Sequence, residues 1–189
     1  MKMEEFKTNL NLKLKGVYPD KVERLVVIDR ISCQRNEFRS ILKSTGRDGI
    51  DQLLDYLDEC GFYYRPSSDV RHHNYPGGLL EHSLGVYKNM LKSSLPESYN
   101  DSVKIVGLLH DVCKCDQFYF VERSIMSHSR DGHGSRSIRI LMKFGIKLTT
   151  AEFRAIRYHM RELHRNSHPL RIAVVKADKK DAAESRSKV

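Results

Sequence analysis

The chain has 189 residues, of which 40% are hydrophobic and 30% charged, a composition typical of one globular domain. No apolar run approaches the ~18 residues that cross a bilayer, and the opening MKMEEFKTNLNLKLKG lacks a signal peptide's apolar core, so we expect a soluble, cytoplasmic protein with no membrane partner. The net charge of +9 favours anionic partners such as nucleotides or nucleic acids, although a basic surface can also serve solubility alone.

Helical periodicity runs through the first two thirds of the chain. KVERLVVIDRI (21–31) predicts a helix near the N-terminus. Further on, apolar residues recur every three or four positions, which predicts helices over residues 49–62, 79–95 and 102–114. Residues 66–78 are rich in Pro, Gly, Ser and Asn and predict a loop between the first two of these helices.

The last third begins with a less regular stretch. Residues 118–134 lack a helical pattern, and their aromatic and β-branched residues could form a small β element. Thr149 and Glu152 fit a capping box at a helix start. Helical spacing returns over 135–145, over 150–164 and after Pro169. No strand alternation of useful length competes, so the expected class is all-α, a compact helical bundle.

Histidines and carboxylates recur at a spacing that suits such a bundle. Each of five lies on or beside a different predicted helix, 19 to 28 residues after the one before: His82, His110, His133, His159 and Asp178. Side chains on successive bundle helices can converge on one interior point, where such folds build metal sites. Any one of them alone could be an ordinary interhelical histidine. Five such residues at this spacing, with Asp111 directly after His110, are harder to explain as ordinary core residues.

Five segments appear in an order that resembles the HD superfamily of metal-dependent phosphohydrolases. They are GGLLEHSL, LLHDVCK, GHGSRS, AIRYHM and VVKADKKDA. The resemblance is closest to a group that includes HD-domain 3′-to-5′ exoribonucleases and small phage and bacterial hydrolases. It implies an N-terminal helical extension (1–39), an HD hydrolase domain (40–184) with a metal site between helices, and a C-terminal tail (185–189). It also allows a phage-encoded protein that acts in the host cytoplasm.

The resemblance implies a metal-ligand set. His82, His110, Asp111 and Asp178 would hold one divalent metal, and Asp111 would bridge to a second metal completed by His133 and His159. A shell made mostly of imidazole suits Mn, Fe, Co, Ni or Zn better than Mg, which prefers oxygen ligands. Whether one metal or two are bound stays open at this point. The expected chemistry is attack on phosphorus by a metal-activated hydroxide.

Three further residues are candidates for the reaction: Lys114 and His73 through the same resemblance, and Arg136 because it lies one helical turn after His133. Lys114, in the arrangement H-D-x-x-K, would contact a phosphate oxygen or the leaving group. His73 would contact substrate or deliver a proton to the leaving oxygen. Arg136 would bind phosphate through paired hydrogen bonds. The alternatives are an exposed lysine, a structural histidine and a solvated helix charge.

The leading function is therefore hydrolysis of phosphoesters in nucleotides or nucleic acid. One alternative is a 3′-to-5′ exonuclease on single-stranded RNA or DNA, with Arg157 and Arg161 in a positive stripe along the helix that carries His159. The same stripe could be an ordinary solvated face. A further alternative is a non-catalytic nucleic-acid-binding protein whose metal is structural. The oligomeric state is not indicated by any pattern.

Overall fold

The protein is all-α in the ranges that the computed structural model describes, residues 1–68, 72–116 and 132–186, as predicted. No strand occurs in these ranges. Most of the possible β element at 118–134 lies outside them. The α-helices are α1 (Met3–Leu14), α2 (Lys21–Lys43), α3 (Ile50–Glu59), α4 (Gly78–Leu91), α5 (Asn100–Leu109), α6 (His133–Lys143), α7 (Thr150–Arg157) and α8 (Pro169–Arg186). Short 3₁₀ helices lie at Phe62–Tyr64, Glu97–Tyr99 and Val112–Asp116.

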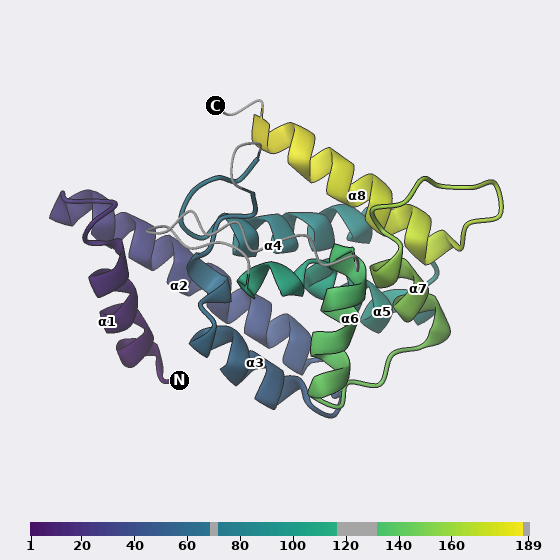
Figure 1. Cartoon of the computed structure of the whole chain (residues 1–189), viewed down its shortest axis with the longest axis horizontal. Coiled ribbons are helices and arrows are strands. Elements are labelled where there is room, and N and C mark those ends of the chain that lie inside the picture. The colour runs from purple at the N-terminus through teal and green to yellow at the C-terminus, as the bar shows by residue number, and fades with distance from the viewer. Residues whose placement is uncertain (69–71, 117–131, 187–189) are drawn as a thin grey trace.

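Helix α4 occupies the middle of the fold (Figure 1). It packs against α5 and α8, and also against α2. Its apolar residues Leu79, Leu80 and Val86 are completely buried, as are Leu108 and Leu109 of α5. This packing fixes the two helices that carry His82 and His110, so the core supports the candidate site directly.

The N-terminal segment shares this core. Helix α2 begins at an Asp20 cap, whose carboxylate accepts a hydrogen bond from the Glu23 N–H at 2.8 Å. It runs without interruption to Lys43, so the predicted boundary at residue 40 falls inside a helix. Buried Phe38 near its C-terminal end packs against Phe62, with ring centroids 5.3 Å apart.

Two predicted helices end earlier than their apolar patterns indicate, at points that matter for the site. The helix predicted over 102–114 ends at Leu109, and the chain tightens so that the Lys114 N–H bonds the Asp111 carbonyl at 2.9 Å. The helix predicted over 150–164 ends at Arg157. Both prediction errors have the same cause. The turn after each helix keeps the same side chains buried, so the apolar spacing continues past the point where the helix ends.

Arg171 explains how the chain can leave the helical path after Arg157. This buried guanidinium donates to the carbonyl oxygens of Tyr158, Arg161 and Glu162, at 3.1, 2.8 and 2.8 Å. Buried carbonyls in a non-helical segment need donors from elsewhere. Arg171 of α8 donates to three of them beyond the end of α7, so the segment that contains His159 is held against α8 in a non-helical shape.

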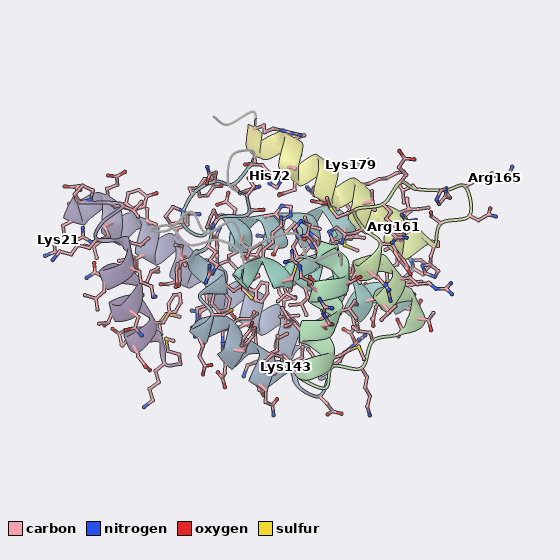
Figure 2. All side chains as sticks on the ribbon, in the orientation of Figure 1. Lys21, His72, Lys143, Arg161, Arg165 and Lys179 are labelled. Atoms are coloured by element: carbon pink, nitrogen blue, oxygen red, sulfur yellow. The ribbon has the colours of Figure 1, made fainter. Side chains whose placement is uncertain are left out.

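Among the described helices, none combines the length and the apolar character needed to traverse a bilayer. Figure 2 shows Lys21, Lys143, Arg165 and Lys179 at four different edges of the molecule.

Candidate metal centre

Five of the six predicted metal ligands come together between α4, α5, α7 and α8. His82 lies on α4, His110 ends α5, Asp111 follows it, His159 lies just beyond α7, and Asp178 lies on α8. Their ligand atoms form two groups within 4.8 Å, which share His110: His82, His110 and Asp178, and His110, Asp111 and His159. The three histidines and Asp111 are buried, and Asp178 is half-buried.

The distances between these atoms suit a metal ion. His82 Nε2 lies 3.4 Å from Asp178 Oδ1 and 3.7 Å from Asp111 Oδ2. Asp111 also lies 3.6 Å from His110 Nε2 through Oδ2, and 3.4 Å from His159 Nε2 through Oδ1. Two atoms bound about 2.1 Å from one metal are about 3.0 Å apart at a right angle and about 3.4 Å apart at a tetrahedral angle. Shifts of a few tenths of an ångström would therefore suffice.

The three buried histidines all present the same ring nitrogen to this centre. In each ring Nδ1 already has an acceptor: Asp181 Oδ2 at 2.7 Å for His82, the Gly107 carbonyl at 3.0 Å for His110, and the Ile156 carbonyl at 2.7 Å for His159. An acceptor at Nδ1 places the ring proton there and leaves the Nε2 lone pair for a metal. The fold thus selects one tautomer at three separate positions.

Four of the ligand atoms that face the centre lack a hydrogen-bond partner within the described ranges. His82 Nε2, His110 Nε2, His159 Nε2 and Asp111 Oδ1 are buried and make no hydrogen bond there. An unpaired buried polar atom costs about 1–3 kcal/mol, so four in one place are unfavourable unless something binds them. Imidazole nitrogen and carboxylate oxygen are ligands of divalent transition metals. The residues therefore fit a metal ion.

Electrostatics keeps most of these groups in the protonation state that ligation needs. Burial lowers the pKa of His110 and lowers that of His82 well below its ordinary value, so both rings are neutral at neutral pH. Burial acts to raise the pKa of Asp111, but Lys114, His110 and His159 together hold it well below its usual range. His159 differs: burial opposes a charge, yet Asp111 raises its pKa, so a proton competes with a metal there.

Lys114 lies where the resemblance placed it, beside the centre. Its Nζ is 2.7 Å from Asp111 Oδ2, and its side chain is 13% exposed. Burial acts to lower the pKa of Lys114, but the Asp111 carboxylate outweighs burial and raises it, so the ammonium stays charged. Because α5 ends at Leu109, Lys114 approaches Asp111 from a 3₁₀ helix rather than from the same α-helical face.

Asp181 is a site residue that the sequence reasoning missed. Its carboxylate holds His82 Nδ1 from the side away from the centre, and burial raises the pKa of Asp181 to about 6. Gly85 makes this contact possible, because a Cβ at that position would collide with Asp181 Oδ1. The missed signal was spacing, since Asp181 lies one helical turn after Asp178 and so on the same face of α8.

His133, the sixth predicted ligand, has the opposite arrangement. It is half-buried at the first position of α6 and belongs to neither group of ligand atoms. Arg136 Nη2 lies 3.0 Å from His133 Nδ1. Arginine only donates, so Nδ1 accepts and a neutral ring carries its proton on Nε2. A second metal at His133 stays a prediction, and it would require this contact to break.

His73 lies behind the centre in the loop before α4. It is a non-glycine residue with a φ of 50°, held by its N–H bond to Ser185 Oγ at 3.0 Å. Its Nε2 is 3.7 Å from Asp181 Oδ2, and its ring centroid is 5.5 Å from that of His82. His72, to which the sequence assigned no role, lies equally close to His82, at 5.3 Å between centroids. The three histidines form a third group that could ligate a metal.

Arg157 and Arg161 are exposed and do not enter the centre. They do not lie on one helical stripe, because α7 ends at Arg157. Their guanidinium carbons instead lie 5.6 and 4.7 Å from the ring centroid of Tyr158. We call Arg157, Tyr158 and Arg161 the surface cluster; its residues lie on both sides of His159 in the sequence.

Comparison of the chain with protein-family models, curated proteins and solved structures found no significant match.

Proposed function

We propose that the protein is a metal-dependent phosphohydrolase that cleaves phosphoester bonds of nucleotides or nucleic acid. The observation that carries the proposal is the convergence of three buried Nε2 atoms, each with its tautomer fixed at Nδ1, on the Asp111 and Asp178 carboxylates. The ordered motifs that resemble the HD superfamily support the same class of reaction.

His82, His110, Asp111 and Asp178 would hold one metal, and His159 lies with His110 and Asp111 in the second group of ligand atoms, on the side of the predicted second metal. An imidazole-rich set of this kind favours Mn, Fe, Co, Ni or Zn over Mg. When bound, such a metal supplies a Lewis acid and lowers the pKa of a coordinated water toward neutrality. The Asp111 and Asp178 carboxylates balance the charge of one divalent ion, and the Lys114 ammonium beside Asp111 adds a positive charge that would attract a phosphate.

The chain's own residues have distinct parts in this proposal. Lys114 would move from Asp111 toward a phosphate oxygen, where its charge stabilises the negative charge that grows during the reaction. Asp181 positions His82 by holding its Nδ1 proton. His73 lies next to Asp181, on the side of His82 that faces away from the centre, so its expected role as the donor of a proton to the leaving oxygen would require the loop before α4 to move.

The surface cluster at Tyr158 favours a second candidate, a single-strand exonuclease. Arg157 and Arg161 flank an aromatic ring just outside His159, and cations combined with a stacking surface are what a single strand requires. Strand binding would weaken steeply as salt increases, whereas binding of a mononucleotide would not. Binding of a labelled single strand at several salt concentrations separates the two substrates.

The test is metal content followed by turnover. Purified protein would be reconstituted with Mn, Fe, Co, Ni or Zn, its metal measured by mass spectrometry, and hydrolysis followed with bis(p-nitrophenyl) phosphate, a nucleotide panel and labelled single strands. Asp111→Ala should lose metal-stimulated turnover, whereas His164→Ala, at an exposed histidine outside the centre, should keep it. Bound metal without turnover would favour a structural metal in a binding protein. Failure to bind any of these metals would overturn the whole assignment.

A further inference from the structure

A cavity of about 310 Å³ lies on the far side of the 3₁₀ helix that follows Asp111. Its lining residues come from α3, from this 3₁₀ helix, and from α6 and the residue after it: Tyr56, Cys113, Arg136, Arg139, Ile140, Lys143 and Phe144. Three of these described lining residues are cations, Arg136, Arg139 and Lys143, and their positive charge attracts anions. A volume near 300 Å³ is the lower end of the range for small-molecule sites. It therefore suits a ligand of about the size of one nucleotide.

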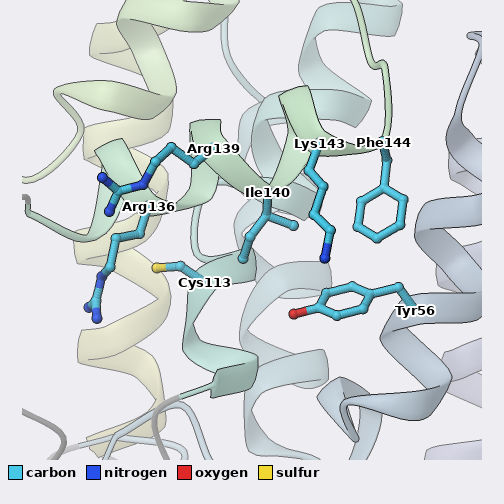
Figure 3. Close-up of a pocket in the computed structure, with 7 residues that line it drawn as sticks. All are labelled: Tyr56, Cys113, Arg136, Arg139, Ile140, Lys143 and Phe144. Atoms are coloured by element: carbon cyan, nitrogen blue, oxygen red, sulfur yellow. The ribbon is translucent and has the colours of Figure 1, made fainter.

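The cavity has two chemically different ends (Figure 3). The guanidinium groups of Arg136 and Arg139 lie together at one end. Tyr56 and Phe144 lie at the other, with ring centroids 5.0 Å apart and an angle of 37° between their planes. Ile140 and Cys113 lie between the ends. Planar guanidinium groups match phosphate oxygens, and aromatic faces match a base, so the cavity offers both halves of a nucleotide in a fixed order.

The aromatic end already holds a cation. Lys143 Nζ lies 5.7 Å from the ring centroids of both Tyr56 and Phe144. Such a contact contributes only modestly at a partly exposed position. A base that stacks on these rings would displace the Lys143 ammonium, which is long enough to follow the ligand's phosphate. Exchange of one weak contact for stacking and a charge contact makes entry of a nucleotide favourable.

The guanidinium end is the part of the cavity whose residues contact His133, the sixth predicted ligand. Arg136 lines the cavity and also contacts His133 Nδ1 at 3.0 Å. Cys113 lines it two residues after Asp111, and its thiol donates to the His133 carbonyl at 3.2 Å. A phosphate held by Arg136 is thus on the side of Asp111, while a base at Tyr56 points away from it.

We propose that this cavity is a nucleotide subsite, which stacks a base on Tyr56 and Phe144 and directs the attached phosphate through Arg139 and Arg136 toward Asp111. The direction of the phosphate rests on the proposed function, but binding of the nucleotide in the cavity does not. The substrate class that follows is a nucleoside phosphate, in which the base itself contributes to affinity.

Calorimetric titration of the full chain tests the subsite, after treatment with a chelator so that hydrolysis does not consume the probe. The probes are adenosine 5′-monophosphate, ribose 5-phosphate and inorganic phosphate. Because stacking of one base strengthens binding by roughly fivefold to a hundredfold, the adenosine compound should bind at least about fivefold more tightly than ribose 5-phosphate. Equal affinities, or no binding of either, would overturn the proposal.

Two matched pairs of variants locate the binding. Tyr56→Leu should reduce the affinity for adenosine 5′-monophosphate to that for ribose 5-phosphate, whereas Tyr56→Phe should keep it. Arg139→Gln should weaken both probes about tenfold, while Lys147→Gln, an equal loss of charge at an exposed residue beyond the cavity, should change neither. Thermal unfolding confirms that each variant is folded. If Tyr56→Leu and Arg139→Gln bind like the parent protein, the subsite is wrong.

The two proposals fail in different ways. Nucleotide binding that depends on Tyr56, in a protein that never hydrolyses a phosphoester, would leave the subsite standing and overturn the proposed function. Metal-stimulated hydrolysis that is unchanged by Tyr56→Leu and Arg139→Gln would support the proposed function and overturn the subsite.

Discussion

Two buried carboxylates, on Glu152 and Asp111, are treated very differently by this fold. Glu152 Oε1 accepts from Arg47 Nη2 at 2.5 Å and from Ser102 at 2.6 Å, while its Oε2 accepts from Arg47 Nη1 at 2.7 Å and from the Thr149 N–H at 2.8 Å. Asp111 has Lys114 on one oxygen and no hydrogen bond on the other within the described chain.

The two clusters differ in how far their polar atoms are paired. Where a buried charge joins helices, as at Glu152, this chain satisfies every lone pair it can. Glu152 and His159 lie seven residues apart, so loose packing of the region does not explain the unpaired atoms around Asp111. The saturated cluster at Glu152 has no atom left for a ligand, whereas the cluster at Asp111 has a group of buried atoms that could hold a metal ion.

Removal of one imidazole from the metal centre is the strongest way to test this contrast. We expect His110→Ala to reduce metal-stimulated phosphoester hydrolysis by about a thousandfold, because a bound metal contributes several kcal/mol to the reaction. Metal content and turnover should fall together. His168→Ala, at a half-buried histidine outside the centre, is the control, and an equal loss in both variants would contradict the assignment.

Removal of the Glu152 charge should affect stability and leave the chemistry intact. Because Glu152→Gln breaks a buried ion pair whose partner Arg47 is 20% exposed, we expect a loss of about 2–3 kcal/mol in the free energy of unfolding. Urea denaturation measures it. Metal content per folded molecule should stay the same. A change in metal affinity without a change in stability would show that the two clusters are not separate.

The stability that Glu152 contributes should also depend on pH. Burial acts to raise the pKa of Glu152, but hydrogen bonds from Arg47, Ser102 and the Thr149 backbone outweigh burial and lower it. A depressed folded pKa means that this stability is fully present above the unfolded value of about 4.3 and is lost as pH falls through the folded pKa. The stability gap between the parent protein and Glu152→Gln should therefore shrink below about pH 4. A constant gap would be evidence against the ion pair.

The smallest expected effect concerns Asp181, which touches the centre only through His82. Asp181→Asn should weaken metal affinity by about tenfold to a hundredfold, because His82 loses the partner that fixes its tautomer. Competition with a metal-binding dye measures the change. Asp181→Glu is too long for the space beside Gly85 and should not restore affinity. Unchanged affinity in Asp181→Asn would limit Asp181 to packing.

Periodicity was enough to predict the helical class. The spacing of the histidines suggested that they converge, and the resemblance to the HD superfamily implied the ligand set, of which His82, His110, Asp111, His159 and Asp178 come together in the structure. Apolar spacing shows which side chains are buried, and a buried histidine remains buried whether its helix continues or turns. For the same reason it could not show that α5 ends at Leu109 or that α7 ends at Arg157. The turn after α7 is held by Arg171, which a later helix brings in.

The aromatic cavity was beyond sequence reasoning for a related cause. Tyr56 and Phe144 lie 88 positions apart and follow ordinary core spacing, so neither stood out as a binding residue. Arg136 did stand out, because it lies one helical turn after His133 in the sequence. The contact between the Arg136 guanidinium and the His133 ring agrees with that separation. What the spacing could not give was the ring nitrogen involved, which decides against His133 as a ligand in this arrangement.

The position of α8 has a consequence for the order of events during synthesis. Asp178, Asp181 and Arg171 all lie on this helix, which is translated after every other segment that contributes to the centre. The helices before it can pack early, but His82 lacks its Nδ1 partner and the turn at His159 lacks its donors until α8 has emerged and docked. A nascent chain would therefore acquire the complete ligand set only after α8 has docked on the earlier helices.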